Sequence, residues 1–571
     1  MWSHSHRPSV RGRRYAVSSL HYLATMAGAR ILEQGGNAAD AGVAAGLCVN
    51  VLEPEMAHFG GVAPIVYCPG EGWGMVETIS GLGRWPGAAS IAHFQQHYDG
   101  DMPETILRTV TPAAPDAWLS ALARWGTMRF EQVVAPALEL AGNGRPVDPR
   151  FYEALSHPEM TRWPSTREVF RPDGRVPQVG ELFQQPDLAR TFERMVAAER
   201  RAGGGREVGI RAARDLIYKG EIAREIAAFH EAEGSWLTYE DLAGFAVRLE
   251  APERVNYKGY EVYSCGAWCQ GPALLMALKL LEGVDLRGMG WGTADYLHTL
   301  LEAIKLVFAD RGAYFGDPDF VKVPLDVLLS AEYAARRRGM IDGERAVVGM
   351  AAAGDVGEGR PEGARRSGSA THQPVWESDT SYVCVVDEWG NAFSATPSDG
   401  LSSTPVVPGL GFAISGRGMQ SWLDTTHASS LQPGKRPRLT PNPSLILKEG
   451  RPVMPLGCPG GDAQVQAMLQ VFLNIVEFGM APQTAIEAPR VVSHSFPNSF
   501  WPHHVRSGEV TAESRWETAV LDELRQRGHI IVDGGEWSSD VARVCTIVVD
   551  EETGVRTAGA DPRSTAYAVA W

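Results

Sequence analysis

The sequence predicts an α/β (α+β) fold in which stacked β-sheets lie between layers of helices. Two observations predict it. Amphipathic helical segments fill much of the first two thirds of the chain, and paired runs of strand-forming residues recur in the last third. A further strand pair, 59–67 and 73–79, precedes most of the helices. It suits one sheet of a sandwich whose other strands come from the second half.

Apolar residues at helical spacing predict the helices. The expected helices cover 20–34, 40–52, 111–125, 130–141, 186–200, 214–233, 273–281, 294–308 and 464–478. Gly35-Gly36 ends the first of them. A short helix is expected after Thr238, with Thr238 as its N-cap and Asp241 at the capping-box position.

Runs of β-forming residues around turn residues predict the strands. Hairpins are expected over 380–396 and 444–456, each reversing at a glycine-containing turn. Residues 254–264 are expected to form one strand, and 408–415 a loop with a short strand. The segments 546–550 and 555–558 are expected to complete a sheet.

Composition excludes several classes of protein. The 571 residues are enough for two ordinary domains or one large one. A net charge of −15 and a pI near 5.5 argue against nucleic-acid binding and against an anionic membrane surface. Residues 1–8 lack the apolar stretch of a signal peptide, and no run of about 18 apolar residues predicts a membrane span. We therefore expect a cytoplasmic protein.

The seven cysteines are scattered and form no Cys-x-x-Cys pair. This pattern is typical of reduced thiols. Cys265 and Cys269 are four residues apart without a nearby cluster of His or Asp, so no metal site is expected.

The most informative stretch is the start of the hairpin 380–396. A polar segment, about 353–376, reads as a flexible linker and runs almost directly into this core strand. Such an arrangement makes sense if the peptide bond between Asp379 and Thr380 must be reached and cut. The threonine hydroxyl can attack the preceding carbonyl, form an ester and be released by water. The new α-amino group, with a pKa of about 7.7–8.0, can then activate that hydroxyl. The alternative is an ordinary threonine on an ordinary hairpin.

Asp379-Thr380-Ser381-Tyr382, with the following Val-Val-Asp-x-x-Gly-Asn-Ala, resembles the processing site of the gamma-glutamyltransferase family of N-terminal-nucleophile (Ntn) hydrolases. Further motifs match the family in the same order, at 35–41, 314–318, 433–437, 457–462, 487–490 and 561–563. The resemblance covers nearly the whole chain. It implies a four-layer αββα sandwich.

The resemblance also implies how the chain is divided. Cleavage would give a large subunit, 1–379, and a small subunit, 380–571, which both contribute strands to one core and stay associated. The chemistry needs no metal or organic cofactor. The expected partner is a small-molecule amide, and a homo-oligomer is possible.

Four residues carry the chemistry that the resemblance implies. Thr380 is the nucleophile, and Ser398 is a second hydroxyl that hydrogen-bonds it. The backbone N–H groups of Gly460 and Gly461, before a helix, stabilise the oxyanion. The alternatives are a simple turn serine at Ser398 and a structural Gly-Gly turn.

The chain departs from the family where gamma-glutamyltransferases bind the substrate's α-amino and α-carboxylate groups, which makes it a divergent member. Ser421 stands at an acidic position, and Gly400 replaces an asparagine. Of the expected pair of serines, only Thr440 keeps a hydroxyl. The ammonium group of a γ-glutamyl substrate therefore loses its charged partner.

The family's carboxylate-binding arginine has no match in register. Arg84, two positions away, can substitute for it, and Arg417 and Arg438 are other candidates. The guanidinium fork of each suits a carboxylate. Each can equally be a solvated or structural arginine.

These observations favour an autocatalytically processed amidohydrolase or acylase whose acyl group is a dicarboxylic monoamide. Oxamate amidohydrolase and glutaryl-cephalosporin acylases are relatives of that kind. One alternative is a true γ-glutamyl hydrolase or transferase in which Asp399 or Asp424 holds the ammonium. Another is an unprocessed binding or scaffold protein.

Overall fold

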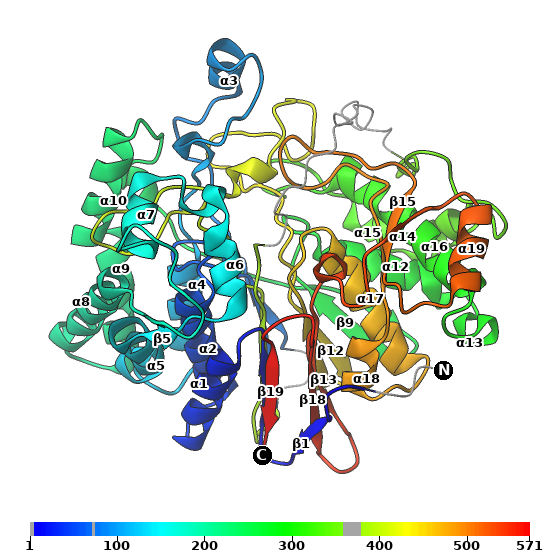
Figure 1. Ribbon diagram of the computed structural model, residues 1–571, viewed down its shortest axis with the longest axis horizontal. Helices are drawn as coiled ribbons and strands as arrows, with labels where there is room; N and C mark the ends of the chain where they lie inside the picture. Colours follow the sequence, from blue (N-terminus) through cyan, green and yellow to red (C-terminus); the bar gives the residue numbers. More distant parts are fainter. Residues whose placement is uncertain (1–4, 71–74, 358–378) are drawn as a thin grey trace.

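The computed structural model describes residues 5–70, 75–357 and 379–571. Two β-sheets stand side by side in the centre of the molecule, and helices cover the outer face of each (Figure 1). The predicted four-layer αββα sandwich is confirmed. Most of the predicted linker, 358–376, lies outside the described residues.

The first sheet is antiparallel and has seven described strands. In spatial order they are β1 (Val10–Gly12), β18 (Arg556–Ala560), β17 (Cys545–Val549), β13 (Arg451–Gly457), β12 (Ser444–Lys448), β9 (Tyr260–Ser264) and β8 (Glu253–Tyr257). The expected single strand 254–264 is wrong. The chain reverses at Lys258 and Gly259, which both have positive φ angles, and β8 pairs with β9 as a hairpin.

The second sheet is also antiparallel. In spatial order its described strands are β19 (Tyr567–Ala570), β2 (Ala16–Ser19), β10 (Val383–Val386), β11 (Ala392–Ala395), β3 (Ile65–Cys68), β4 (Glu77–Ile79) and β7 (Leu249–Glu250). The predicted hairpin is β10–β11, and it pairs with β2 and β3 from the start of the chain. Apolar and small side chains from both sheets fill the space between them, including Tyr382, Cys384 and Cys545.

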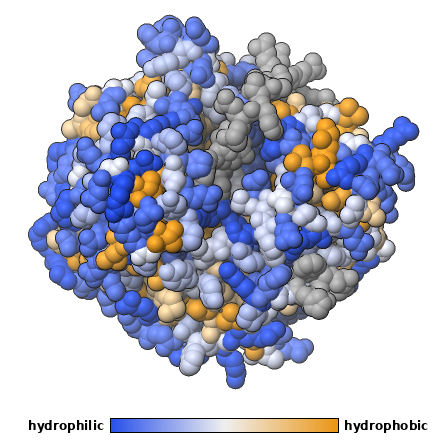
Figure 2. All heavy atoms as spheres, viewed as in Figure 1, coloured by the Kyte–Doolittle hydropathy of each residue, from blue (hydrophilic) through white to orange (hydrophobic). Residues whose placement is uncertain are grey.

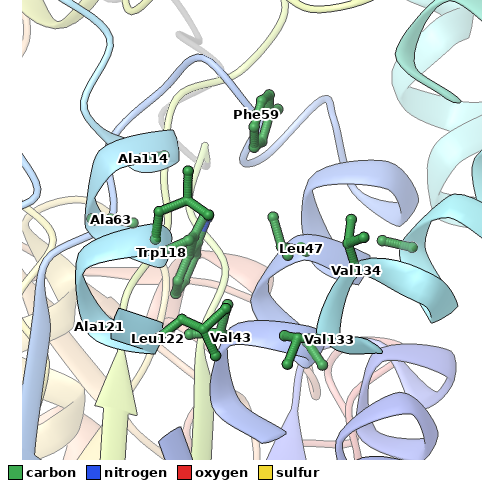
Figure 3. Close-up of a cluster of buried hydrophobic side chains, with 14 of the residues drawn as sticks. Val43, Leu47, Phe59, Ala63, Ala114, Trp118, Ala121, Leu122, Val133 and Val134 are labelled. Carbon is green, nitrogen blue, oxygen red and sulfur yellow. The ribbon is translucent and has the colours of Figure 1, made fainter. Parts of the chain in front are cut away.

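The helices that cover the second sheet come from the first half of the chain. They are α1 (Tyr22–Glu33), α2 (Ala38–Leu52), α4 (Ala114–Trp125), α5 (Phe130–Asn143), α8 (Pro186–Ala202), α9 (Arg206–Tyr218) and α10 (Glu221–Ala232). Figure 3 shows the ring of Trp118 directed from α4 toward α2. A Cβ on Gly46 of α2 would lie 2.5 Å from that ring, so the close packing of α2 and α4 requires glycine there.

The helices that cover the first sheet are α12 (Gly271–Glu282), α14 (Ala294–Tyr314), α16 (Ala331–Arg338), α17 (Ala463–Val476), α18 (Pro482–Glu487) and α19 (Thr518–Gln526). The expected helix 214–233 is wrong, because α9 ends before Gly220 and α10 begins after it. The predicted capping box of Thr238 and Asp241 is confirmed at α11 (Tyr239–Ala243).

Shorter elements lie around these four layers. They are α3 (Ile91–His97), α6 (Pro149–Ser156), α7 (Pro164–Phe170), α13 (Leu286–Met289), α15 (Leu325–Leu328), β5 (Arg145–Pro146), β6 (Leu182–Phe183), β14 (Val491–Ser493), β15 (Glu509–Ala512) and β16 (Ile530–Asp533). Residues 408–415, expected to include a short strand, make only an isolated bridge between Val406 and Ala413.

Figure 2 shows hydrophilic side chains over most of one face, with apolar residues in separate patches. This mixture is typical of a surface that faces water. None of the helices in the part of the chain that the structure describes has the length and apolar character needed to cross a membrane.

Candidate active site

Thr380 stands three residues before β10, at the end of the sheet where the hairpin enters the core. It is fully buried and forms an isolated antiparallel bridge with Ser398, which follows β11. The Oγ1 atom of Thr380 lies 2.7 Å from the Oγ atom of Ser398. The hairpin therefore brings the two hydroxyl groups together, as the sequence predicts.

The hydroxyl of Ser398 is hydrogen-bonded on all sides. It donates to the carbonyl oxygen of Asp379 and accepts from the Nη2 atom of Arg417. A serine hydroxyl has one proton and two lone pairs. Because that proton is directed at Asp379, the proton shared with Thr380 must come from Thr380. The nucleophile candidate is thus oriented as a donor to Ser398.

The carbonyl oxygen of Asp379 belongs to the peptide bond that joins Asp379 to Thr380, and three donors surround it. The backbone N–H of Asp399 donates to it at 3.2 Å and the Nη2 atom of Arg417 at 3.0 Å. The hydroxyl of Ser398 is the third donor. Donors aimed at one carbonyl oxygen polarise it and can stabilise negative charge that develops there.

Asp399 reaches this position through a strained backbone. Its φ angle is 105°, a region that residues with a side chain rarely adopt. The surrounding structure fixes it. The carbonyl of Asp399 accepts from the N–H of His58 at 3.0 Å, and its carboxylate accepts from the hydroxyl of Ser415. Burial lowers the pKa of His58 to about 4, so this imidazole is neutral.

Arg417 begins the short 3-10 helix η4 (Arg417–Gln420) and is fully buried. Its Nη2 atom lies 3.0 Å from the carboxylate of Asp379, and its Nε atom lies 3.8 Å from that of Asp399. Burial raises the pKa of Asp379 to about 6, although the guanidinium of Arg417 opposes this rise. Arg417 is one of the three candidate arginines predicted from the sequence, and it contacts Asp379 and Ser398.

Two buried glutamates, Glu53 and Glu55, lie close to Ser381 and Gly400 respectively. The hydroxyl of Ser381 donates to the carboxylate of Glu53 at 2.7 Å. Burial, together with the neighbouring Glu53, raises the pKa of Glu55 to about 8, so that carboxyl group is protonated at neutral pH.

Gly460 and Gly461 follow β13 and precede α17. Both have positive φ angles, 116° and 53°. A Cβ on Gly460 would lie 2.9 Å from the Cβ of Ala542. Gly457, at the end of β13, packs so closely on the ring of Tyr382 that a Cβ there would overlap it. The glycine loop therefore begins beside Tyr382, two residues after Thr380.

A second hydrogen-bonded group holds the glycine loop and two more predicted residues. The side-chain amide of Gln270 donates to the carbonyls of Gly461 and Thr440, both at 2.8 Å. Gln420, at the end of η4, donates to the hydroxyl of Thr440 at 3.0 Å. Because η4 carries Arg417 at one end and Gln420 at the other, it connects this group to the residues around Thr380.

Arg438 belongs to this second group. It is buried, donates to the carbonyl of Arg311 and to the hydroxyl of Ser499, and lies over the ring of Trp422 at 4.7 Å. Burial and the nearby Arg311 hold the pKa of Arg438 well below its usual range. Its position points to a structural role.

Ser421 and Gly400, where the chain departs from the family, are both held by packing. The hydroxyl of Ser421 accepts from the indole N–H of Trp85 at 2.9 Å. A Cβ on Gly400 would lie 2.5 Å from the carbonyl oxygen of Glu55, so a larger residue does not fit there. An asparagine at this position would therefore require the backbone at Glu55 to shift.

Arg84 lies elsewhere. Its backbone exchanges hydrogen bonds with Thr111, and burial with the nearby Arg248 and Arg436 lowers its pKa. The residues brought together at Thr380 are therefore Asp379, Ser398 and Arg417, with Asp399 and Glu53. The last two were missed as parts of the nucleophile group. The adjacency of Asp399 to Ser398 was the one available signal.

Among the described residues, one group has metal-ligand geometry: His298, Glu302 and His529. The two imidazoles hydrogen-bond each other at 2.9 Å, and Glu302 accepts from Lys305 at 2.7 Å and from the N–H of Val347. Burial lowers the pKa of His529 to about 3. The carboxylate of Glu302 already pairs with the ammonium group of Lys305. We therefore interpret the three residues as a buried polar network.

The gamma-glutamyltranspeptidase family model matches residues 24–571. The chain belongs to this family. A glutathione hydrolase-like proenzyme of Bacillus subtilis is 31% identical, over 98% of this chain and 99% of its own length.

Two solved structures are also similar to this family member. One, described as LmbA2991HD, is 38% identical with a TM-score of 0.92, and it covers 99% of this chain and 100% of its own. A cephalosporin acylase from Bacillus halodurans is 29% identical with a TM-score of 0.85, covering 100% and 98%. These two solved structures therefore share the architecture of the whole chain.

Proposed function

We propose that this chain is an autocatalytically processed Ntn amidohydrolase in which Thr380 is the nucleophile. One observation carries the proposal. The carbonyl of Asp379 is held by three donors, while the adjacent Thr380 hydroxyl is hydrogen-bonded to one of them, Ser398. A threonine that only packs in a hairpin needs no such arrangement. The relatives' designation as a proenzyme supports the same reading.

In the cleavage step, the Oγ1 atom of Thr380 attacks the carbonyl carbon of Asp379. The hydroxyl proton leaves through Ser398 and reaches the peptide nitrogen, the C–N bond breaks, and an ester joins Asp379 to Thr380. Asp399, Arg417 and Ser398 stabilise the intermediate oxyanion. Water then hydrolyses the ester, which frees the Asp379 carboxylate and restores the hydroxyl.

In turnover, the new α-amino group of Thr380 is the base. It accepts the hydroxyl proton while the oxygen attacks the substrate amide, and it returns that proton to the leaving amine. The N–H groups of Gly460 and Gly461 are proposed to hold the oxyanion at this stage. Water, or an amine, then releases the acyl group from Thr380.

The sheet arrangement supports two fragments that stay together. Both sheets contain strands from residues 1–379 and strands from residues 380–571. In the second sheet β10 and β11 of the small fragment lie between β2 and β3 of the large one. Separation of the fragments would therefore break strand pairing inside each sheet.

The acyl group is proposed to be a dicarboxylic monoamide without an α-amino group. Ser421 is neutral, and its hydroxyl already accepts from Trp85. Gly400 offers no side chain and has no space for one. A γ-glutamyl ammonium would therefore be desolvated without a charged partner, which costs several kcal/mol. The likeness to a cephalosporin acylase supports an acyl group of another kind.

The alternative is γ-glutamyl hydrolysis, which the name of the Bacillus subtilis relative favours. Asp399 or Asp424 would then have to bind the ammonium. Asp399 is engaged by Ser415 and Arg417, and Asp424 accepts two hydrogen bonds from Thr426. These contacts make the alternative weaker.

The first test measures the masses of the fragments, the N-terminal sequence of the smaller fragment and the hydrolysis of candidate substrates. Scaled from 61.9 kDa, processing gives fragments of about 41 and 21 kDa, as the Ntn mechanism requires. The smaller fragment must begin Thr-Ser-Tyr-Val. Hydrolysis of succinamate and glutaramate is then compared with that of glutathione. A single uncleaved band that binds ligands would indicate a scaffold protein, and efficient glutathione hydrolysis would establish the γ-glutamyl alternative.

A further inference from the structure

We propose that Asp379 of the uncleaved chain occupies the subsite that later receives the acyl group's carboxylate, and that Arg417 binds this carboxylate. The inference rests on the proposed function, because it applies to the acyl-enzyme formed on Thr380. It also fixes the length of the acyl group. The preferred class is then monoamides of four-carbon dicarboxylic acids.

The two ester intermediates have the same connection. In self-cleavage, the carbonyl carbon of Asp379 becomes joined to the Oγ1 atom of Thr380. In turnover, the acyl carbon of the substrate becomes joined to that same oxygen. The side chain of Asp379 therefore indicates where substituents of an acyl group extend from Thr380.

The carboxylate of Asp379 lies among buried residues that could also bind the carboxylate of a substrate. Its Oδ2 atom lies 3.0 Å from Arg417, whose guanidinium also lies over the ring of Phe500 at 5.8 Å. Gly400 packs on the same side chain, since a Cβ there would lie 3.3 Å from the Cβ of Asp379. Both Arg417 and Phe500 are buried. The carboxylate therefore contacts a buried cation that packs on an aromatic ring, and a glycine packs on the Cβ atom of the same aspartate.

Departure of Asp379 leaves the guanidinium of Arg417 incompletely partnered. Among the described residues, its Nε and Nη1 atoms already have no hydrogen-bond partner in the uncleaved chain. Nη2 then also loses the carbonyl and the carboxylate of Asp379. The carboxylate of Asp399, 3.8 Å away, is the charge that remains. A buried guanidinium with free donors favours a bidentate anion.

The covalent structure of aspartate sets the acyl length. Two carbons, Cα and Cβ, separate its carbonyl carbon from its carboxylate, which is the spacing of a succinyl group. A glutaryl group is one methylene longer and an oxalyl group two carbons shorter. Because the subsite is buried, a mismatch in length separates the carboxylate from Arg417.

The other two candidate arginines do not occupy this position. Arg438 donates to Arg311 and Ser499, and Arg84 lies near Arg248 and Arg436. In the described ranges, neither of them forms a hydrogen bond or an ion pair with Asp379, Thr380 or Ser398. They serve as matched controls for Arg417.

The first experiment is calorimetric titration of the cleaved wild-type protein with oxalate, succinate, adipate and butyrate. We expect succinate to bind at least about 30-fold more tightly than butyrate or adipate, as for a buried, hydrogen-bonded charge pair. Arg417→Gln should erase this difference in its cleaved fraction. Arg84→Gln and Arg438→Gln should retain it. Equal binding of butyrate and succinate, or loss of selectivity in Arg84→Gln, would overturn the assignment.

The second experiment does not depend on cleavage, so it separates failure of this inference from failure of the proposed function. Thr380→Ala combined with Asp379→Gly vacates the subsite in an uncleaved chain. Acetate should then raise its melting temperature, as it refills the carboxylate position. It should not do so in Thr380→Ala alone, or when Arg417→Gln is added. If acetate has no effect on the double variant, Arg417 is not a carboxylate site, whether or not the wild-type chain is cleaved.

Discussion

Two buried arginine–aspartate pairs, Arg490–Asp561 and Arg417–Asp379, differ in how many nitrogens of the arginine have a hydrogen-bond partner. Every nitrogen of the Arg490 side chain has a partner: Nε and Nη1 donate to backbone carbonyls, and Nη2 donates both to a carbonyl and to Asp561 at 2.6 Å. Arg417 is equally buried, but its Nε and Nη1 atoms have no hydrogen-bond partner in the described part of the chain. Its close partners belong to Asp379 and Ser398.

The two aspartates differ in the same way. Burial alone would raise the pKa of Asp561, but Arg490 and Arg563 lower it to about 2. Burial raises the pKa of Asp379 to about 6, because the single guanidinium of Arg417 does not offset it. We interpret the fully hydrogen-bonded pair Arg490–Asp561 as a structural pair that stays in place. A partly partnered pair beside Thr380 suits a carboxylate that leaves.

The largest effect should come from changing Thr380, the proposed nucleophile, because the loss of Asp379 from its pair with Arg417 depends on cleavage at this residue. Thr380→Ala should abolish cleavage and reduce turnover by at least about 10⁴-fold, because both the hydroxyl and the exposed amine are lost as a unit. Thr380→Ser keeps both groups and should still be cleaved. Gel electrophoresis and amide hydrolysis measure the two effects. Full cleavage of Thr380→Ala would refute self-processing by this residue.

The second prediction compares the two arginines directly in the uncleaved Thr380→Ala background. Arg490→Met should lower the free energy of unfolding by about 3–5 kcal/mol, because it leaves a buried carboxylate and several carbonyls without their donor. Arg417→Met should cost less, since Asp379 can take up a proton. Urea unfolding monitored by circular dichroism measures both. Equal decreases in the free energy of unfolding would mean that the two pairs contribute equally to stability.

The sequence predicted the residues around Thr380 better than it predicted where some helices end. The family resemblance implied the roles of Thr380 and Ser398, and the hairpin accounts for their contact, because the residues that flank β10 and β11 face each other across it. Periodicity likewise predicted most helices. It could not predict the break at Gly220, where a Cβ would lie 2.7 Å from the carbonyl of Leu216, because that contact depends on how the chain turns.

Partner choice among buried arginines was also beyond the sequence. Arg84, Arg417 and Arg438 were equivalent candidates, and the structure gives them three different environments. Arg490 and Asp561 each belonged to a matching motif, yet nothing in their spacing indicated that they pair across 71 positions. Such pairings are set by the packing of layers that are distant in the chain.

The third prediction sharpens the comparison at the glycine loop. Arg490 donates to the carbonyl of Ala542, against which Gly460 packs. Gly460→Ala introduces a side chain at a φ of 116° and should displace the loop. We expect turnover to fall by about 10²–10³-fold, as for loss of an oxyanion donor. Cleavage at Thr380 should persist, because other donors hold the Asp379 carbonyl. Loss of cleavage and turnover together would mean that one oxyanion site serves both steps.

The smallest effect is a pH dependence that belongs to Asp379 alone. Its pKa in the folded, uncleaved chain is about 6, above the ordinary value of 3.8. The folded state therefore holds a proton that the unfolded state has lost. This contribution to stability is complete below about pH 4 and disappears as the pH rises through 6, and it amounts to about 2–3 kcal/mol.

Asp561 has the opposite sign, because its pKa is lowered to about 2. Its contribution is present above about pH 4 and is lost only as the pH falls toward 2. Unfolding of Thr380→Ala should thus become easier between pH 4 and pH 7, relative to the same chain with Asp379→Asn. If the free energy of unfolding varies with pH in the same way with and without Asp379→Asn, then Arg417 offsets the effect of burial on the pKa of Asp379. Arg490 and Arg563 do the same for Asp561. The contrast between the permanent and the transient pair would then be lost.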